Sequence, residues 1–63
     1  MFQVWFTNFQ YFSQEQFKTL HEAKVYVGRH GFEAQIYAPN EENEDDLDMV
    51  ASFEVFRGWR SYT

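Results

Sequence analysis

The sequence contains no cysteine, one proline, three glycines and only five lysines and arginines in 63 residues. Without cysteine, neither a disulfide nor a thiolate-bound metal can stabilise the fold. No apolar run approaches the roughly 18 residues of a membrane-spanning helix, and the first residues lack the basic and apolar segments of a secretory signal. We therefore expect a single domain over residues 1–63 that works in the cytoplasm.

Motifs for catalysis or metal binding are also missing. There is no nucleophile elbow, no phosphate-binding glycine loop and no zinc-protease motif. Residues 41–48, a strongly acidic segment, lack the glycine and glutamate spacing of an EF-hand calcium loop. His21 and His30 lie nine positions apart in a predicted helix, so they point about 180° away from each other. The sequence thus predicts no enzymatic activity, no cofactor and no metal site.

Aromatic residues, in contrast, make up 22% of the chain, and eight of them are phenylalanines. A domain of this size buries only about 60% of the surface that its unfolded chain exposes. Each buried aromatic side chain removes roughly 150–250 Å² from water. We therefore expect most phenylalanines to form the core, and self-association to be a compatible second source of stability.

Three segments alternate between apolar and other side chains, which predicts strands: Phe2–Thr7, Phe32–Tyr37 and Val50–Phe56. Proline cannot donate to a strand ladder, so Ala38-Pro39 ends the second of them. The stretch Phe9–Phe12 leaves two alternatives open, a short strand that returns as a hairpin or an irregular aromatic segment.

The clearest local pattern predicts a helix that begins after Thr19. Thr19 and Glu22 form a capping box, in which Thr19 accepts from the amide of Glu22 and Glu22 reaches back to the amide of Thr19. Gly31 suits the left-handed residue that follows a helix ending near His30. The helix has one narrow apolar stripe, formed by Leu20, Ala23 and Val27.

A strand, a helix and a second strand in this order favour a right-handed parallel crossover, and the next strand would return antiparallel. We therefore predict an α+β fold, a two-layer β-α-β-β sandwich with one helix on a small mixed sheet. The N-terminal hairpin would add a further strand. Residues 38–49 form an acidic loop in this prediction, and residues 58–63 form a tail of unclear order.

One helix covers only one face of a sheet, so aromatic side chains remain on the other. Strand alternation places Trp5 and Tyr37 on this uncovered face, and Tyr11 or Trp59 could join them. Such a face suits a homodimer contact, a partner hot spot or a platform on which bases stack. The scarcity of lysine and arginine argues against nucleic acid.

The net charge of −5 comes from one segment. Outside residues 41–48 the chain has four acidic residues against five lysines and arginines. The acidic segment is either a solvated loop that aids solubility, a mimic of nucleic-acid phosphate or a docking element for a basic surface of another protein. Its acidic residues are Glu41, Glu42, Glu44, Asp45, Asp46 and Asp48.

The runs FKTLHEAKVYVGRHGFEAQIY, at Phe17–Tyr37, and VASFEVFRG, at Val50–Gly58, resemble small uncharacterised proteins encoded by bacteriophages and prophages. That family has no assigned activity, so the resemblance implies a phage or prophage origin but no catalytic or binding residues. A shorter skeleton is similar to a small phage inhibitor of host RNA polymerase; it consists of Thr19, Leu20, Glu22, Ala23, Gly31, Phe32 and Glu33.

Together these observations predict a small interaction module that binds a host protein, a phage protein or itself. Single-stranded nucleic-acid binding on the aromatic face is the first alternative. The second is inhibition of a host nucleic-acid enzyme, such as RNA polymerase, through the acidic loop.

Overall fold

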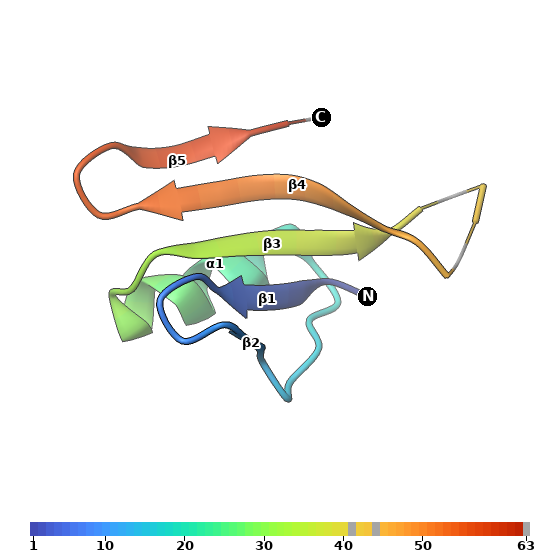
Figure 1. Ribbon diagram of the computed structural model, residues 1–63, viewed down its shortest axis with the longest axis horizontal. Helices are drawn as coiled ribbons and strands as arrows, with labels where there is room; N and C mark the ends of the chain where they lie inside the picture. Colours follow the sequence, from blue (N-terminus) through green and yellow to red (C-terminus); the bar gives the residue numbers. More distant parts are fainter. Residues whose placement is uncertain (41, 44, 63) are drawn as a thin grey trace.

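The computed structural model describes residues 1–40, 42, 43 and 45–62. One five-stranded sheet, in the order β2-β1-β3-β4-β5, forms one layer, and α1 packs on one of its faces as the second layer (Figure 1). The elements are β1 (Gln3–Phe6), β2 (Tyr11–Phe12), α1 (Leu20–His30), β3 (Ala34–Pro39), β4 (Leu47–Glu54) and β5 (Gly58–Ser61).

Every neighbouring pair of strands in this sheet is antiparallel. The predicted β-α-β-β arrangement with a mixed sheet and a parallel crossover from the first strand is therefore wrong. The reason is the extra reversal that β2 introduces before the helix. Because β2 and β3 each pair antiparallel with β1, the crossover through α1 joins β2 to β3, with β1 between them.

Of the two alternatives for Phe9–Phe12, a returning hairpin strand or an irregular segment, the structure shows the hairpin, formed by β1 and β2. The amide of Gln10 donates to the carbonyl of Phe6 at 2.8 Å, which closes the turn. Gln10 has a positive φ of 55°. The amide of Ser13 then donates to the carbonyl of Val4 at 2.7 Å. Tyr11 and Phe12 thus form a very short edge strand, and Phe9 and Gln10 lie in the turn before it.

The predicted helix is confirmed at both ends. The amide of Glu22 donates to Thr19 Oγ1 at 3.1 Å, as a capping box requires. The Glu22 carboxylate, however, accepts from the amide of Lys18, at 3.3 Å, one residue earlier than expected. Gly31 ends the helix with φ 71°, and its amide donates to the carbonyl of Val27.

The C-terminal part of the chain differs from the tail that the sequence predicted. Residues Gly58–Ser61 form β5, which pairs with the second half of β4. A turn at residues 55–57 joins the two strands, and its Phe56 side chain is 98% exposed. β4 begins at Leu47 and β3 ends at Pro39, so the connection between them is shorter than the predicted loop 38–49.

The core lies between α1 and the middle of the sheet. Only one of the eight phenylalanines, Phe6, is fully part of it, so the expectation that most of them are buried is wrong. Aliphatic side chains fill the space because α1 approaches the sheet through small residues. The buried cluster is Val4, Phe6, Ala23, Val27, Ala34, Ile36, Val50 and Ala51. Within the described residues, no helix has the length and apolar content that crossing a membrane requires.

Candidate protein-binding face

Strand alternation sorts the side chains of the sheet onto two faces. Val4, Ile36 and Ala51 lie opposite one another in the ladder and point toward α1, where all three are buried. Their neighbours along the strands point to the opposite side, which α1 does not cover; Val50, at a bulge in β4, is the exception and belongs to the core. We call this side the open face; its residues are Gln3, Trp5, Phe12, Glu33, Gln35, Tyr37, Leu47, Met49, Ser52, Glu54, Arg60 and Tyr62.

Three aromatic rings form a contiguous cluster on the open face. Trp5 and Phe12 are cross-strand partners, with ring centroids 4.8 Å apart and an interplanar angle of 61°. Phe12 also meets Tyr37 edge-on, at 5.9 Å and 70°. The Tyr37 hydroxyl donates to Gln35 Oε1 at 2.7 Å, which fixes the ring over its own strand. The rings hold one another in place and leave Phe12 41% exposed.

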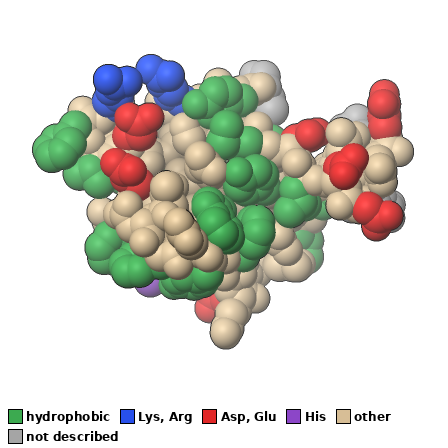
Figure 2. Space-filling model, in the orientation of Figure 1, with side chains coloured by type: hydrophobic (Ala, Val, Ile, Leu, Met, Phe, Trp, Pro, Cys, Tyr) green, Lys and Arg blue, Asp and Glu red, His purple; other side chains and the backbone are tan. Residues whose placement is uncertain are grey.

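The opposite half of the open face is built by β4 and β5. Met49 lies opposite Tyr37 in the ladder, so the apolar surface continues from β3 onto β4. The hydroxyl groups of Ser52 and Tyr62 are 3.2 Å apart and share a hydrogen bond. Figure 2, in which α1 lies behind the sheet, shows hydrophobic side chains along the middle of the face and acidic ones beyond the end of β3. Acidic and basic side chains also gather at the other end of the face, near the turn between β4 and β5.

The structure brings only two of the four predicted aromatic site residues to this face. Trp5 and Tyr37 lie there, as strand alternation predicted. Tyr11 pairs with Phe6 and lies on the α1 side, with the two ring centroids 5.7 Å apart. Trp59 pairs with Phe53 on the α1 side as well, and Lys24 of the helix lies over its ring. Tyr11 and Trp59 therefore belong to the packing around the helix.

Sequence reasoning missed Phe12, Met49 and Tyr62, which are among the larger side chains of the open face. A signal for Phe12 was present, because a hairpin that pairs Phe6 with Tyr11 must place Phe12 beside Trp5. Met49 was hidden by a bulge between Ile36 and Tyr37, which shifts the partners on β4 by one residue. Tyr62 follows a strand that the sequence did not predict.

The described residues of the acidic segment lie between β3 and β4 and at the start of β4, and two asparagine side chains hydrogen-bond to them. Asn40 Oδ1 accepts from the amide of Glu42 at 2.8 Å, and Asn43 Oδ1 accepts from the amide of Asp45 at 3.1 Å. The Asn43 amide nitrogen donates to Asp46 Oδ2 at 3.2 Å. The carboxylates of Glu42, Asp45, Asp46 and Asp48 belong to exposed residues. Two predicted site residues, Glu41 and Glu44, lie outside the described residues.

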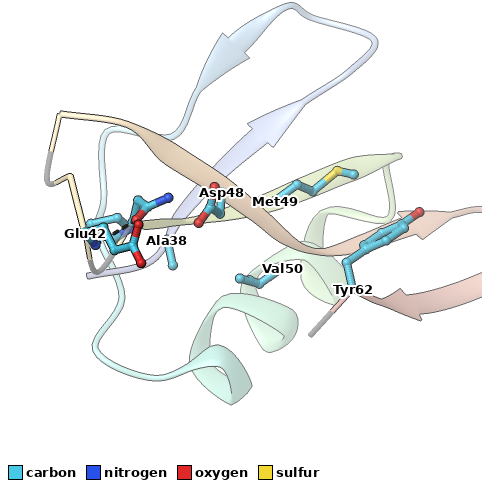
Figure 3. A pocket seen from close by; sticks show the side chains of 8 residues that line it. Ala38, Glu42, Asp48, Met49, Val50 and Tyr62 are labelled. Atoms are coloured by element: carbon cyan, nitrogen blue, oxygen red, sulfur yellow. Dashed lines mark hydrogen bonds between the residues drawn. The ribbon is translucent and has the colours of Figure 1, made fainter.

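A groove of about 700 Å³ separates this acidic segment from the C-terminal end of β5. Figure 3 shows Tyr62 at one end, Glu42 near the other, and Asp48 and Met49 of β4 between them. The remaining lining residues are Ala38, Pro39, Asn40 and Val50. β4 thus carries residues of both surfaces, Asp48 of the acidic segment and Met49 of the open face, side by side at the groove.

The two histidines lie apart. His30 packs its ring against Tyr26 and Phe6, with centroid distances of 4.5 and 5.5 Å. His21 lines a separate surface depression with Phe17. No group of three or more His, Asp or Glu side chains that could hold a metal ion occurs among the residues that the structure describes.

Comparisons of the chain with protein-family models, with curated proteins and with solved structures give no match. The resemblance to phage-encoded proteins therefore stays a prediction from the sequence. The open face and the adjoining groove are the features on which a functional proposal can rest.

Proposed function

We propose that this chain is a non-enzymatic interaction module that binds a protein partner through the open face of its sheet. The observation that carries the proposal is the composition of this face. Tyrosine, tryptophan, phenylalanine, methionine and arginine are enriched at the cores of protein interfaces, whereas lysine, aspartate and glutamate are depleted there. The open face has Trp5, Tyr37 and Met49 near its middle. Its charged residues Glu33, Glu54 and Arg60 lie toward one end, where Glu54 is 3.7 Å from Arg57.

The acidic segment supports a partner with a basic surface. Exposed carboxylates at one end of the module would steer association with such a partner at low salt. The partner in this proposal is a host or phage protein in the cytoplasm, as the sequence resemblance suggests. A host enzyme that binds nucleic acid has a basic surface of this kind, so inhibition of such an enzyme is a specific form of the proposal.

Binding of single-stranded nucleic acid is the competing function. Bases could stack on Trp5 and Phe12, since any aromatic ring offers a stacking surface. Among the residues described, however, the basic side chains on this side are Arg60 and, at its rim, Arg57, which pairs with Glu54. Phosphate contacts dominate nucleic-acid affinity, and two arginines offer few of them. The balance of charge therefore favours a protein partner.

The test is capture of a partner from bacterial lysate on the immobilised chain, followed by its identification and by affinity measurement with the purified partner. The test variant combines Trp5→Ser and Phe12→Ser, which removes the two stacked rings of the open face. The matched control is Phe56→Ser, because Phe56 is 98% exposed and lies in the turn between β4 and β5. We expect the double variant to lose at least tenfold in affinity, as hot-spot aromatics do, and the control to lose nothing.

Three results would contradict the proposal. The first is equal loss of affinity in the control and in the double variant. The second is tight binding of a single-stranded oligonucleotide that weakens steeply with salt while no protein is retained. The third concerns self-association: if the chain sediments as a dimer that Trp5→Ala dissociates, then a second copy covers the open face.

A further inference from the structure

β4 is twice as long as the strand that covers its outer edge. It spans Leu47–Glu54, whereas β5 pairs with it from Ala51 to Glu54. Among the residues that the structure describes, the last bond on this side runs from the amide of Tyr62 to the carbonyl of Val50, at 3.0 Å. Within the described part of the chain, residues 47–49 have no neighbouring strand on this side.

The backbone of this segment offers donors and acceptors to the outside. Bonded and non-bonded pairs alternate along an antiparallel ladder. The amide of Asn40 donates to the carbonyl of Asp46 at 2.9 Å, so the Asp46 and Asp48 backbones face β3. The N–H and C=O groups of Leu47 and Met49 therefore point away from β3, into the groove beside β4. Such an edge is a template for a further strand.

The side chains of the same segment alternate in character. Asp48 lies opposite Ala38, which packs against the core on the α1 side. Leu47 and Met49 lie on the other side, where Met49 extends the apolar surface of the open face. If a partner strand pairs with this edge, its residue opposite Asp48 lies beside a carboxylate. The residues on either side of it in the partner strand lie beside the apolar side chains of Leu47 and Met49.

We propose that the outer edge of β4 at Leu47–Met49 binds an extended segment of the partner protein in which a lysine or arginine stands between two apolar residues. The inference rests on the proposed function and names the chemistry of the partner. The groove of about 700 Å³ accommodates such a segment, since clefts that bind ligands span about 300–1,000 Å³. Main-chain bonds to the edge give affinity, and the alternating side chains give specificity.

The negative charge of the groove favours a basic segment of a partner protein over a second copy of this acidic chain. The lining of the groove contains the carboxylates of Glu42 and Asp48 and, among the described residues, no lysine or arginine. Two copies that paired edge to edge would bring these carboxylates toward those of the other copy, and like charges across a strand pair are destabilising. A nucleic-acid backbone is repelled for the same reason.

The probe is an end-capped synthetic peptide of sequence Ser-Val-Lys-Val-Lys-Val-Ser, with Ser-Val-Glu-Val-Glu-Val-Ser as its charge-reversed control. Binding is followed by amide NMR shifts of the full chain at low salt. We expect the basic peptide to shift the amides of Leu47 and Met49 and to slow their hydrogen exchange, because these groups become bonded. The acidic peptide should leave both amides unchanged.

Two peptide variants test the strand geometry directly. Methylation of the valine amide nitrogens removes donors that face β4, and it should abolish binding. Methylation of the lysine amide nitrogens alters groups that face outward, and it should leave binding intact. Equal effects of the two modifications would overturn the proposed pairing.

Variants of the chain test the charge. Asp48→Asn should weaken binding of the basic peptide about threefold, and the pair Asp48→Asn with Glu42→Gln roughly tenfold, as expected for exposed ion pairs. Glu54→Gln is the matched control, because it makes the same charge change on β4 where β5 covers the edge. An equal loss in the control would overturn the assignment of the site.

The outcomes separate this inference from the proposed function. If a purified partner needs Trp5 and Phe12 but the basic peptide does not bind, the edge inference is wrong and the proposed function stands. If the peptide binds at Leu47 and Met49 while no partner depends on the open face, the proposed function is wrong.

Discussion

Lys24 of α1 holds its ammonium nitrogen 5.3 Å from the centre of the Trp59 ring on β5. A cation over an indole ring is attracted by the negative face of the ring. Trp59 also stacks against Phe53, its cross-strand partner, with a centroid distance of 5.1 Å. The contact ties the edge strand β5 to the helix, so Trp59 serves the packing of the fold.

Trp59→Ala should therefore lower the free energy of unfolding by about 2 kcal/mol, less than the 3–5 kcal/mol typical of a fully buried tryptophan. Chemical denaturation measures the change. Lys24→Met keeps most of the apolar stem and should cost about 0.5 kcal/mol, the value of an exposed cation–π contact. Partner binding by the folded Trp59→Ala variant should stay at the wild-type level; its loss would mean that Trp59 belongs to the binding surface.

The helix cap gives a second prediction. Thr19→Ala removes the side-chain acceptor of the Glu22 amide and should destabilise the chain by about 1 kcal/mol. Thr7→Ala is the matched control, since Thr7 is exposed in the β1–β2 turn and uses only its backbone amide, which donates to the Glu33 carbonyl. Thermal unfolding of the two variants compares them, and similar midpoints would show that the cap contributes nothing.

What the sequence predicts well is local. The helix ends depend on Thr19, Glu22 and Gly31, which lie within or next to the helix, so their pattern is legible without the rest of the fold. Strand pairing is not local. Whether β1 and β3 are parallel depends on whether Tyr11 and Phe12 add a reversal, and two residues carry too little periodicity to decide it.

The candidate site shows the same division. Trp5 and Tyr37 were placed correctly because alternation within a single strand is enough to assign a face. Trp59 was not, because its face depends on the register of β5 against β4. The groove beside β4 arises from the difference in length between these two strands, which no residue pattern encodes.

The central contact of the core gives a third prediction. Ile36 is fully buried and lies between Val4 and Ala51 in the ladder. Ile36→Ala should cost about 3 kcal/mol, because it leaves a cavity that β3 cannot close. A domain of this size has a total stability of only about 3–9 kcal/mol, so the variant should be largely unfolded in moderate urea.

The matched control for Ile36 is Val25→Ala on the exposed side of α1, where Val25 is 42% exposed. Alanine has the higher helix propensity, so this variant should be neutral or stabilised by about 0.5 kcal/mol. Equal destabilisation of the two variants would contradict the assignment of the core to the face of the sheet that meets α1.

The last prediction concerns alkaline pH. The ring of Tyr26 packs against Phe17 and His30, with centroid distances of 4.9 and 4.5 Å. Burial, then the negative charge of Glu15 and the nearby Tyr11, raises the pKa of the Tyr26 hydroxyl above its ordinary value of 10.0. The folded state therefore keeps this proton at a pH at which the unfolded chain has already lost it.

The sign of the effect follows from this difference in bound protons. Below pH 10 both states hold the proton, so the contribution to stability is complete, and it is lost as pH rises from 10 through the raised pKa of Tyr26 in the folded state. Urea denaturation from neutral to alkaline pH should show this decline, and Tyr26→Phe should remove it. Glu15→Gln should reduce it, because it lowers the pKa of Tyr26 toward its ordinary value. If Tyr26→Phe retains the full decline, another group causes the alkaline loss of stability.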